Sequence, residues 1–133
     1  MSALGAYFRF QIKNTTGASS SATASTIKGR RWKPASDGSA DYENTEQTFF
    51  TVSSISSGGY GSGSGFDNDT SAGYYGATLQ IKIVNGTSAG YYEVRIQRST
   101  DGGTTWGDNG TGDPVAVIYC GANATVVTTT ELR

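Results

Sequence analysis

The chain has 133 residues and a mass of 13.9 kDa, with ten Lys and Arg, eleven Asp and Glu, and a net charge of −1. The absence of histidine excludes Ser-His-Asp and Cys-His catalysis and ordinary histidine-bearing zinc sites, and one cysteine cannot form an internal disulfide. The charge balance argues against a nucleic-acid partner, and no apolar run is long enough for a membrane span, so we expect one domain over residues 1–133 with no membrane or nucleic-acid partner.

The first half of the chain predicts three strands. Residues 8–13 alternate apolar and polar side chains, which is the period of a half-buried strand. A second strand is expected over residues 24–33 and should end at Pro34, which lacks a backbone donor. A third strand is expected over residues 42–55. Residues 56–76 are then expected to form a long Gly/Ser loop.

The second half predicts four more strands. Residues 77–84 and 91–98 alternate clearly, and Asn85-Gly86 between them is a strong hairpin signal. Residues 115–120 are apolar at both odd and even positions, which predicts a central strand covered on both faces. Residues 126–132 are rich in Thr and predict a last strand near an edge.

About seven strands, no helical periodicity and abundant Gly predict an all-β fold. We expect an antiparallel β-sandwich of immunoglobulin-like type, with a jelly roll as the alternative. An exposed edge strand, either residues 3–13 or residues 126–132, could add to a partner's sheet.

Aromatic residues in and beside the Gly-rich loops are the candidate binding residues. Tyr gives contact area at low entropic cost, while Gly and Ser let a loop adapt to its partner. The predicted partner-binding residues are Tyr60, Phe66, Tyr74, Tyr75, Tyr91 and Trp106. Residues 70–75 are repeated as residues 87–92, which indicates either a local duplication or two Tyr-Tyr platforms at one end of the sandwich.

Residues 99–106 read Ser-Thr-Asp-Gly-Gly-Thr-Thr-Trp and fit the pattern S-x-D-x-G-x-T-W. This pattern resembles the Asp-box, a hairpin motif that sialidases repeat. The resemblance implies a structural turn in which Ser99 and Asp101 bond backbone amides and Trp106 packs over the hairpin.

Other candidate sites have simpler structural interpretations. The basic run of residues 28–33 is followed by acidic residues across a predicted turn, which favours ion pairs between adjacent strands over a nucleic-acid strip. Residues 67–69 and 108–113 are typical of turns rather than of a calcium loop. Cys120 is expected to be a buried, inert thiol. We expect no catalytic residue, no cofactor and no metal site.

Taken along its whole length, the chain resembles the small immunoglobulin-like decoration, tail and fibre-base proteins of tailed bacteriophages. The features that carry this resemblance are the Gly/Ser/Thr richness, the all-β pattern and the absence of histidine and of a leader. The resemblance implies a non-enzymatic virion structural protein that binds neighbouring capsid or tail subunits. Capsid decoration is the leading role, with the protein a homo-oligomer in the particle. It implies synthesis in the host cytoplasm without secretion.

Two further functions stay open. One is a glycan-binding module of a phage tail or fibre, in which aromatic rings stack on the sugars of a host surface. Its candidate residues are Tyr74, Tyr75, Tyr91, Tyr92 and Trp106. The other is a fragment of a glycoside hydrolase, suggested by the Asp-box and needing paired carboxylates, of which Glu93 and Glu131 are the first to test.

Overall fold

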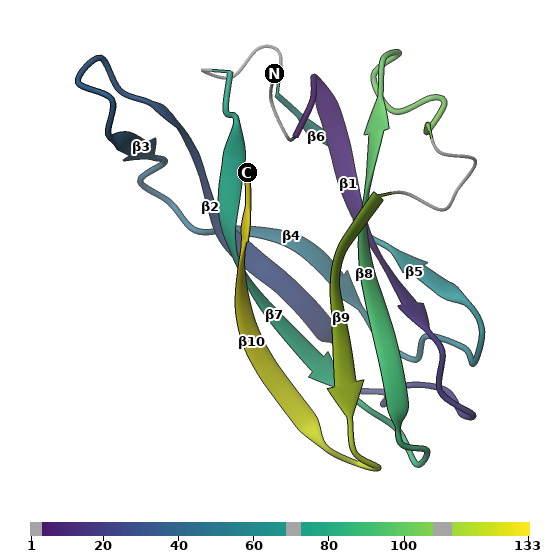
Figure 1. Cartoon of the computed structure of the whole chain (residues 1–133). Coiled ribbons are helices and arrows are strands. Elements are labelled where there is room, and N and C mark those ends of the chain that lie inside the picture. The colour runs from purple at the N-terminus through teal and green to yellow at the C-terminus, as the bar shows by residue number, and fades with distance from the viewer. Residues whose placement is uncertain (1–3, 69–72, 108–112) are drawn as a thin grey trace.

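The computed structural model describes residues 4–68, 73–107 and 113–133. Within these ranges the chain forms ten strands and no helix, arranged as two antiparallel sheets that pack face to face (Figure 1). The predicted antiparallel β-sandwich is therefore confirmed.

Each sheet contains five of the ten strands. The first sheet has the order β5-β1-β8-β9, and β6 also pairs with β1. Its members are β1 (Tyr7–Asn14), β5 (Tyr60–Ser62), β6 (Phe66–Asp67), β8 (Gly90–Ser99) and β9 (Asp113–Cys120). The second sheet has the order β10-β7-β2-β3, and β4 also pairs with β2. Its members are β2 (Ser25–Pro34), β3 (Ala40–Tyr42), β4 (Gln47–Val52), β7 (Gly76–Val84) and β10 (Thr125–Leu132).

In the first sheet β5 and β6 share one edge position, and in the second sheet β3 and β4 do the same. Each sheet therefore has four strand positions. An immunoglobulin constant domain instead sets four strands against three, with its first two strands paired. Here β1 pairs with β8 rather than with β2, and β10 lies beside β7. Eight positions in two sheets are the strand count of the jelly-roll alternative.

Two of the predicted elements in the first half are subdivided. Of the expected third strand, residues 42–55, only residues 47–52 form a strand, β4, and Tyr42 ends β3. The chain leaves the sheet after β3, where Glu43 turns inward to Arg31. The expected loop at residues 56–76 contains β5 and β6, which pair with β1 through residues 60–62 and 66–67. The sequence did not predict these strands, because Gly61 has no side chain and the segment shows no alternation of apolar and polar residues.

The hairpin predicted at Asn85-Gly86 is wrong. The chain there crosses from β7 in the second sheet to β8 in the first. The Asn85 side chain is 3% exposed, and its amide group donates to the carbonyl oxygens of Ser88 and Gly121 at 2.9 Å each. Its oxygen accepts from the Tyr92 hydroxyl at 2.7 Å. Asn85 thus ties this crossing to the β9–β10 turn, which is a tertiary role that a local turn signal cannot reveal.

The two strands at the C-terminal end are both edge strands. For β10 this confirms the prediction, whereas for β9 it contradicts the expected central position. Val117 on β9 is 63% exposed, because its side chain lies on the outer face of the first sheet, which no described element covers. The other expected edge, residues 3–13, is also wrong, since β1 lies between β8 and the pair β5 and β6.

The core between the sheets is built around four phenylalanine rings. Phe8, Phe10, Phe49 and Phe66 make ring contacts with centroid distances of 5.0–5.8 Å. Aliphatic side chains from both sheets complete it, and they include Ile12, Ile27, Leu79, Ile81, Ile83, Val94 and Ile96. Cys120 is fully buried in this core, as expected, and burial raises the pKa of its thiol.

Candidate functional site

The six predicted partner-binding residues do not form one surface. Tyr60, Tyr75 and Tyr91 are 40%, 44% and 54% exposed, and they belong to three separate parts of the fold. Phe66 packs in the ring cluster of the core. The last two, Tyr74 and Trp106, are partly buried, each against an arginine.

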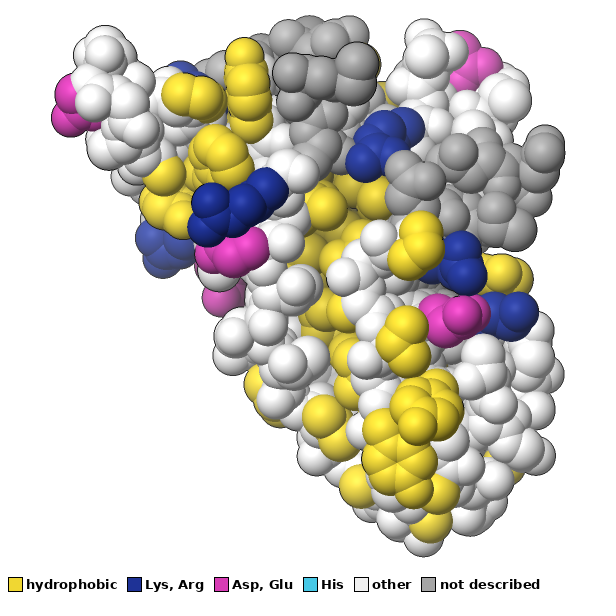
Figure 2. Space-filling view, viewed as in Figure 1, with side chains coloured by type: hydrophobic (Ala, Val, Ile, Leu, Met, Phe, Trp, Pro, Cys, Tyr) yellow, Lys and Arg dark blue, Asp and Glu magenta, His cyan; other side chains and the backbone are white. Residues whose placement is uncertain are grey.

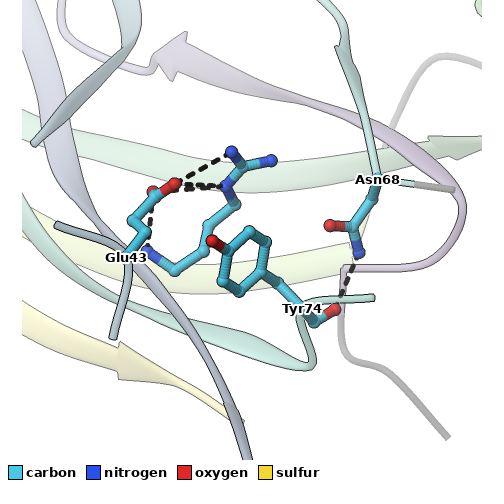
Figure 3. Close-up of polar contacts among 4 residues, drawn as sticks. Glu43, Asn68 and Tyr74 are labelled. Atoms are coloured by element: carbon cyan, nitrogen blue, oxygen red, sulfur yellow. Dashed lines mark hydrogen bonds and ion pairs between the residues drawn. The ribbon is translucent and has the colours of Figure 1, made fainter. Parts of the chain in front are cut away.

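Tyr74 is held at one end of the core by a buried ion pair. The Arg31 guanidinium carbon lies 4.6 Å from the centre of the Tyr74 ring, and Arg31 Nη2 lies 2.9 Å from Glu43 Oε2. The amide group of Asn68 donates to the Tyr74 carbonyl oxygen at 2.7 Å (Figure 3). Arg31 and Glu43 lie on either side of the β2–β3 hairpin, which confirms that the basic run forms an ion pair with a following acid. Tyr74 therefore has a structural role here.

The Asp-box turn also has the predicted local structure. Ser99 Oγ accepts the Gly103 amide at 2.9 Å, and Asp101 Oδ1 accepts the Thr105 amide at 2.8 Å. The bond from the Thr105 amide, followed by one from the Ser99 hydroxyl, lowers the pKa of Asp101. Trp106 packs on Tyr7 and Arg9, with the Arg9 guanidinium carbon 4.4 Å from the ring centre. The motif thus fixes the turn after β8 against β1.

The repeated segment does not produce paired Tyr-Tyr platforms at one end. Tyr75 precedes β7 at the upper end of the molecule, whereas Tyr91 begins β8 at the lower end (Figure 1). Tyr92 is fully buried, so it cannot stack on a glycan. Residues 69–72, which include half of the first copy, lie outside the described residues.

The two carboxylates that the hydrolase hypothesis would pair lie on opposite faces. Glu93 is on the outer face of the first sheet, where Arg95 Nη2 lies 3.4 Å from it. Glu131 is on the outer face of the second sheet and accepts a hydrogen bond from Thr78 at 2.7 Å. Glycosidase carboxylates must flank one bond at separations of about 5–10 Å. The described residues therefore do not bring these two acids into one cleft, and they hold no cluster of three potential metal ligands.

Sequence analysis missed the largest apolar feature of the first sheet, which we call the β9 edge surface. It consists of Tyr91, Val117 and Tyr119, which are 54%, 63% and 57% exposed. Tyr91 and Tyr119 are register partners with ring centroids 5.3 Å apart. Figure 2 shows hydrophobic side chains gathered over the lower parts of β8 and β9. Residues 117–120 are all apolar, so no alternation in the sequence shows that Val117 and Tyr119 face outward while Ile118 faces the core.

The long free edges of the sandwich lie on one side. The edge strands β9 and β10 have eight residues each, and they run next to one another in Figure 1. On the other side the edge positions are divided among strands of two, three, three and six residues. Natural sheets protect their edges with short strands, charges and prolines. The part of β9 after Pro114 has none of these protections.

A groove with a volume of about 580 Å³ lies on the outer face of the second sheet. Its lining includes Tyr42 and four charged side chains, which come from β2, from β10 and from the segment after β3: Lys28, Arg30, Glu46 and Glu131. A neighbouring hollow of about 310 Å³ shares Tyr42 and Glu131 and adds Trp32. Trp32 and Tyr42 are register partners across β2 and β3. None of the six predicted partner-binding residues lines this groove.

Comparison with known proteins gives no relative from which a role could be transferred. The chain matches no protein-family model, no curated protein and no solved structure. The described part of the chain has no helix that is long and apolar enough to cross a membrane.

Proposed function

We propose that the protein is a non-enzymatic structural subunit of a virus particle, a capsid decoration protein, that assembles by pairing copies of itself through the β9 edge surface. One observation carries this proposal: three large hydrophobic side chains, each more than half exposed, lie beside a strand edge with which no strand of the described residues pairs. Tyrosine is enriched in the centres of protein interfaces, and a free edge offers backbone hydrogen bonds to another strand.

The contact is an antiparallel pairing of β9 with β9 of a second copy. Such a two-fold contact is self-complementary, because the same surface of each subunit meets its own counterpart. It would extend the first sheet across both subunits and cover Val117 and Tyr119. The absence of charged residues between Pro114 and Cys120 supports this arrangement, because no charge would be desolvated or would face its own copy.

Size-exclusion chromatography with light scattering over a range of protein concentrations tests the self-association. We expect a dimer that Tyr119→Ser weakens about 30-fold, since truncating a central aromatic residue of an interface costs about 2 kcal/mol. Tyr60→Ser is the matched control, because Tyr60 is similarly aromatic and 40% exposed but lies on the opposite edge of the same sheet. A chain that stays monomeric, or a dimer that only Tyr60→Ser weakens, contradicts the proposed contact.

The virion role needs a separate measurement. Quantitative mass spectrometry of purified particles should find the chain at a fixed copy ratio to the major capsid protein. Particles that lack the chain would refute the virion role, while the self-association result would stand on its own.

A further inference from the structure

The groove on the outer face of the second sheet brings charged, polar and aromatic side chains together. It lies on the face of the sandwich opposite to the β9 edge surface, and it is formed by three strands that are far apart in the sequence. Side chains from β2, β7 and β10 alternate between the core and this outer face. The residues with the outward parity are Lys28, Arg30, Thr78, Gln80, Thr129 and Glu131.

The polar groups of this groove are available to a ligand. Lys28, Arg30 and Glu46 make no side-chain hydrogen bond or ion pair with the described part of the chain. Glu131 has one bond, from Thr78, and a carboxylate can accept several. The groove thus presents unused donors and unused acceptors side by side.

The aromatic residues of the groove lie together at one end. Tyr42 is 43% exposed, and its hydroxyl has only a long hydrogen bond, 3.4 Å, with Thr78, whose own proton goes to Glu131. Trp32 is its partner across the strand pair and lines the adjoining hollow, which also shares Glu131 with the groove. In Figure 2, hydrophobic, basic and acidic side chains stand together beside the β2–β3 hairpin and the end of β10. The groove and the hollow share Tyr42 and Glu131, and we refer to the two together as the track.

We infer that this track binds a neutral oligosaccharide. Each sugar hydroxyl both donates and accepts hydrogen bonds, so it can pair with the two cations, the two carboxylates and the Gln80 amide of the groove. The apolar face of a sugar ring can also stack on an aromatic side chain. A volume of about 580 Å³ lies within the usual range of small-ligand sites, about 300–1,000 Å³. The groove balances two positive against two negative side chains, and the adjoining hollow adds only Arg133, which favours a ligand without a large net charge.

Other occupants fit the same chemistry less well. A nucleic acid would bring its phosphates to Glu46 and Glu131, where like charges repel. An apolar helix or strand would remove four charged side chains from water without giving them partners. The inference is independent of the proposed self-association, because Tyr42 and β9 belong to different sheets.

The test is an NMR titration of the ¹⁵N-labelled full chain with cellohexaose, maltohexaose and chitohexaose as separate probes. We expect at least one probe to give saturable shifts at the amides of β2, β7 and β10. Tyr42→Ala should weaken that binding about tenfold or more, which corresponds to about 1.4 kcal/mol. Tyr60→Ala, which removes an equally exposed ring from the other sheet, should leave it unchanged.

Gln80→Leu is a second variant that removes hydrogen-bonding capacity from an exposed strand position and leaves both aromatic residues in place. It should also weaken the binding. The inference is overturned if no hexasaccharide gives saturable shifts at millimolar concentration, or if both groove variants bind as the wild type does. Saturable binding of the oligonucleotide dT12 to these amides, with no saccharide response, would also overturn it. None of these outcomes changes the dimer measurement.

Discussion

Removing the charge of Glu43 should strongly destabilise the fold, although the substitution Glu43→Gln hardly changes the side chain's shape. Both partners of the ion pair are buried, with side-chain exposures of 9% for Arg31 and 7% for Glu43. Glu43 accepts the backbone amide of Arg31 at 2.9 Å, and its two oxygens accept guanidinium bonds at 2.9–3.2 Å. A glutamine can keep the bonds at one oxygen, but its NH₂ group would then face Arg31 Nη2, donor against donor.

The expected loss is about 3 kcal/mol, because breaking a buried pair from one side leaves an uncompensated charge. Two lost charge-assisted hydrogen bonds at about 1.5 kcal/mol each give the same figure. Urea unfolding followed by circular dichroism measures this loss, and Glu46→Gln is the control because that carboxylate is exposed. The double variant Arg31→Met/Glu43→Leu should recover much of the stability. A Glu43→Gln variant within 1 kcal/mol of the wild type would show that the pair is solvated, and would refute the reasoning.

Three further predictions concern single positions. Asp101→Asn should destabilise the chain at neutral pH. The pKa of Asp101 is lower in the folded chain than in the unfolded chain, so its carboxylate stabilises the fold above the unfolded-state pKa, and this stabilisation is lost as the pH falls through the folded-state pKa. The difference in unfolding free energy between wild type and variant should therefore disappear in acid. Urea unfolding at pH 7 and pH 2.5 checks this, and a constant difference contradicts it. Gly29→Ala should lower the free energy of unfolding by about 2 kcal/mol in the same assay, because the added Cβ would lie 2.2 Å from the Thr78 carbonyl oxygen. Gly121→Ala is the control and should lower it little, because the nearest atom to its added Cβ is 3.8 Å away. Cys120 should react with iodoacetamide only after unfolding, as mass spectrometry can show, because burial raises its thiol pKa; rapid labelling of the folded chain would disprove this.

The strands that alternate strictly were predictable from the sequence. Phe8, Phe10 and Ile12 face the core as their period of two indicates, and so do Leu79, Ile81 and Ile83. One buried face is enough to fix such a strand, because a shift of one residue would expose the whole apolar set. The Asp-box turn was predictable for a similar reason, since all of its bonds lie within a few residues of Ser99.

The sheet positions of the strands were not predictable in the same way. Val117 and Tyr119 are as apolar as residues of a buried strand, and the sequence does not show whether another layer covers the outer face on which they lie. Asn85-Gly86 is typical of a tight turn, but the bonds of Asn85 to Gly121 and Tyr92 depend on the assembled sandwich. Local patterns therefore predict a strand better than its place in a sheet.

The candidate sites depend on the same long-range information. The Tyr-rich composition of residues 56–76 predicted binding residues in a loop, whereas Tyr74 and Phe66 pack against the core. The groove combines Tyr42, Lys28 and Glu131 from three strands, and no spacing in the sequence brings them together. Only Tyr91 is shared between the predicted binding residues and the surfaces from which we argue.

The most direct test of the proposed assembly is hydrogen–deuterium exchange of the full chain, measured at protein concentrations below and above the association midpoint. We predict that association slows exchange in β9 and at the start of β8, and leaves residues 56–67 unchanged. Slowed exchange confined to residues 56–67, with β9 exchanging equally fast at both concentrations, would contradict the account.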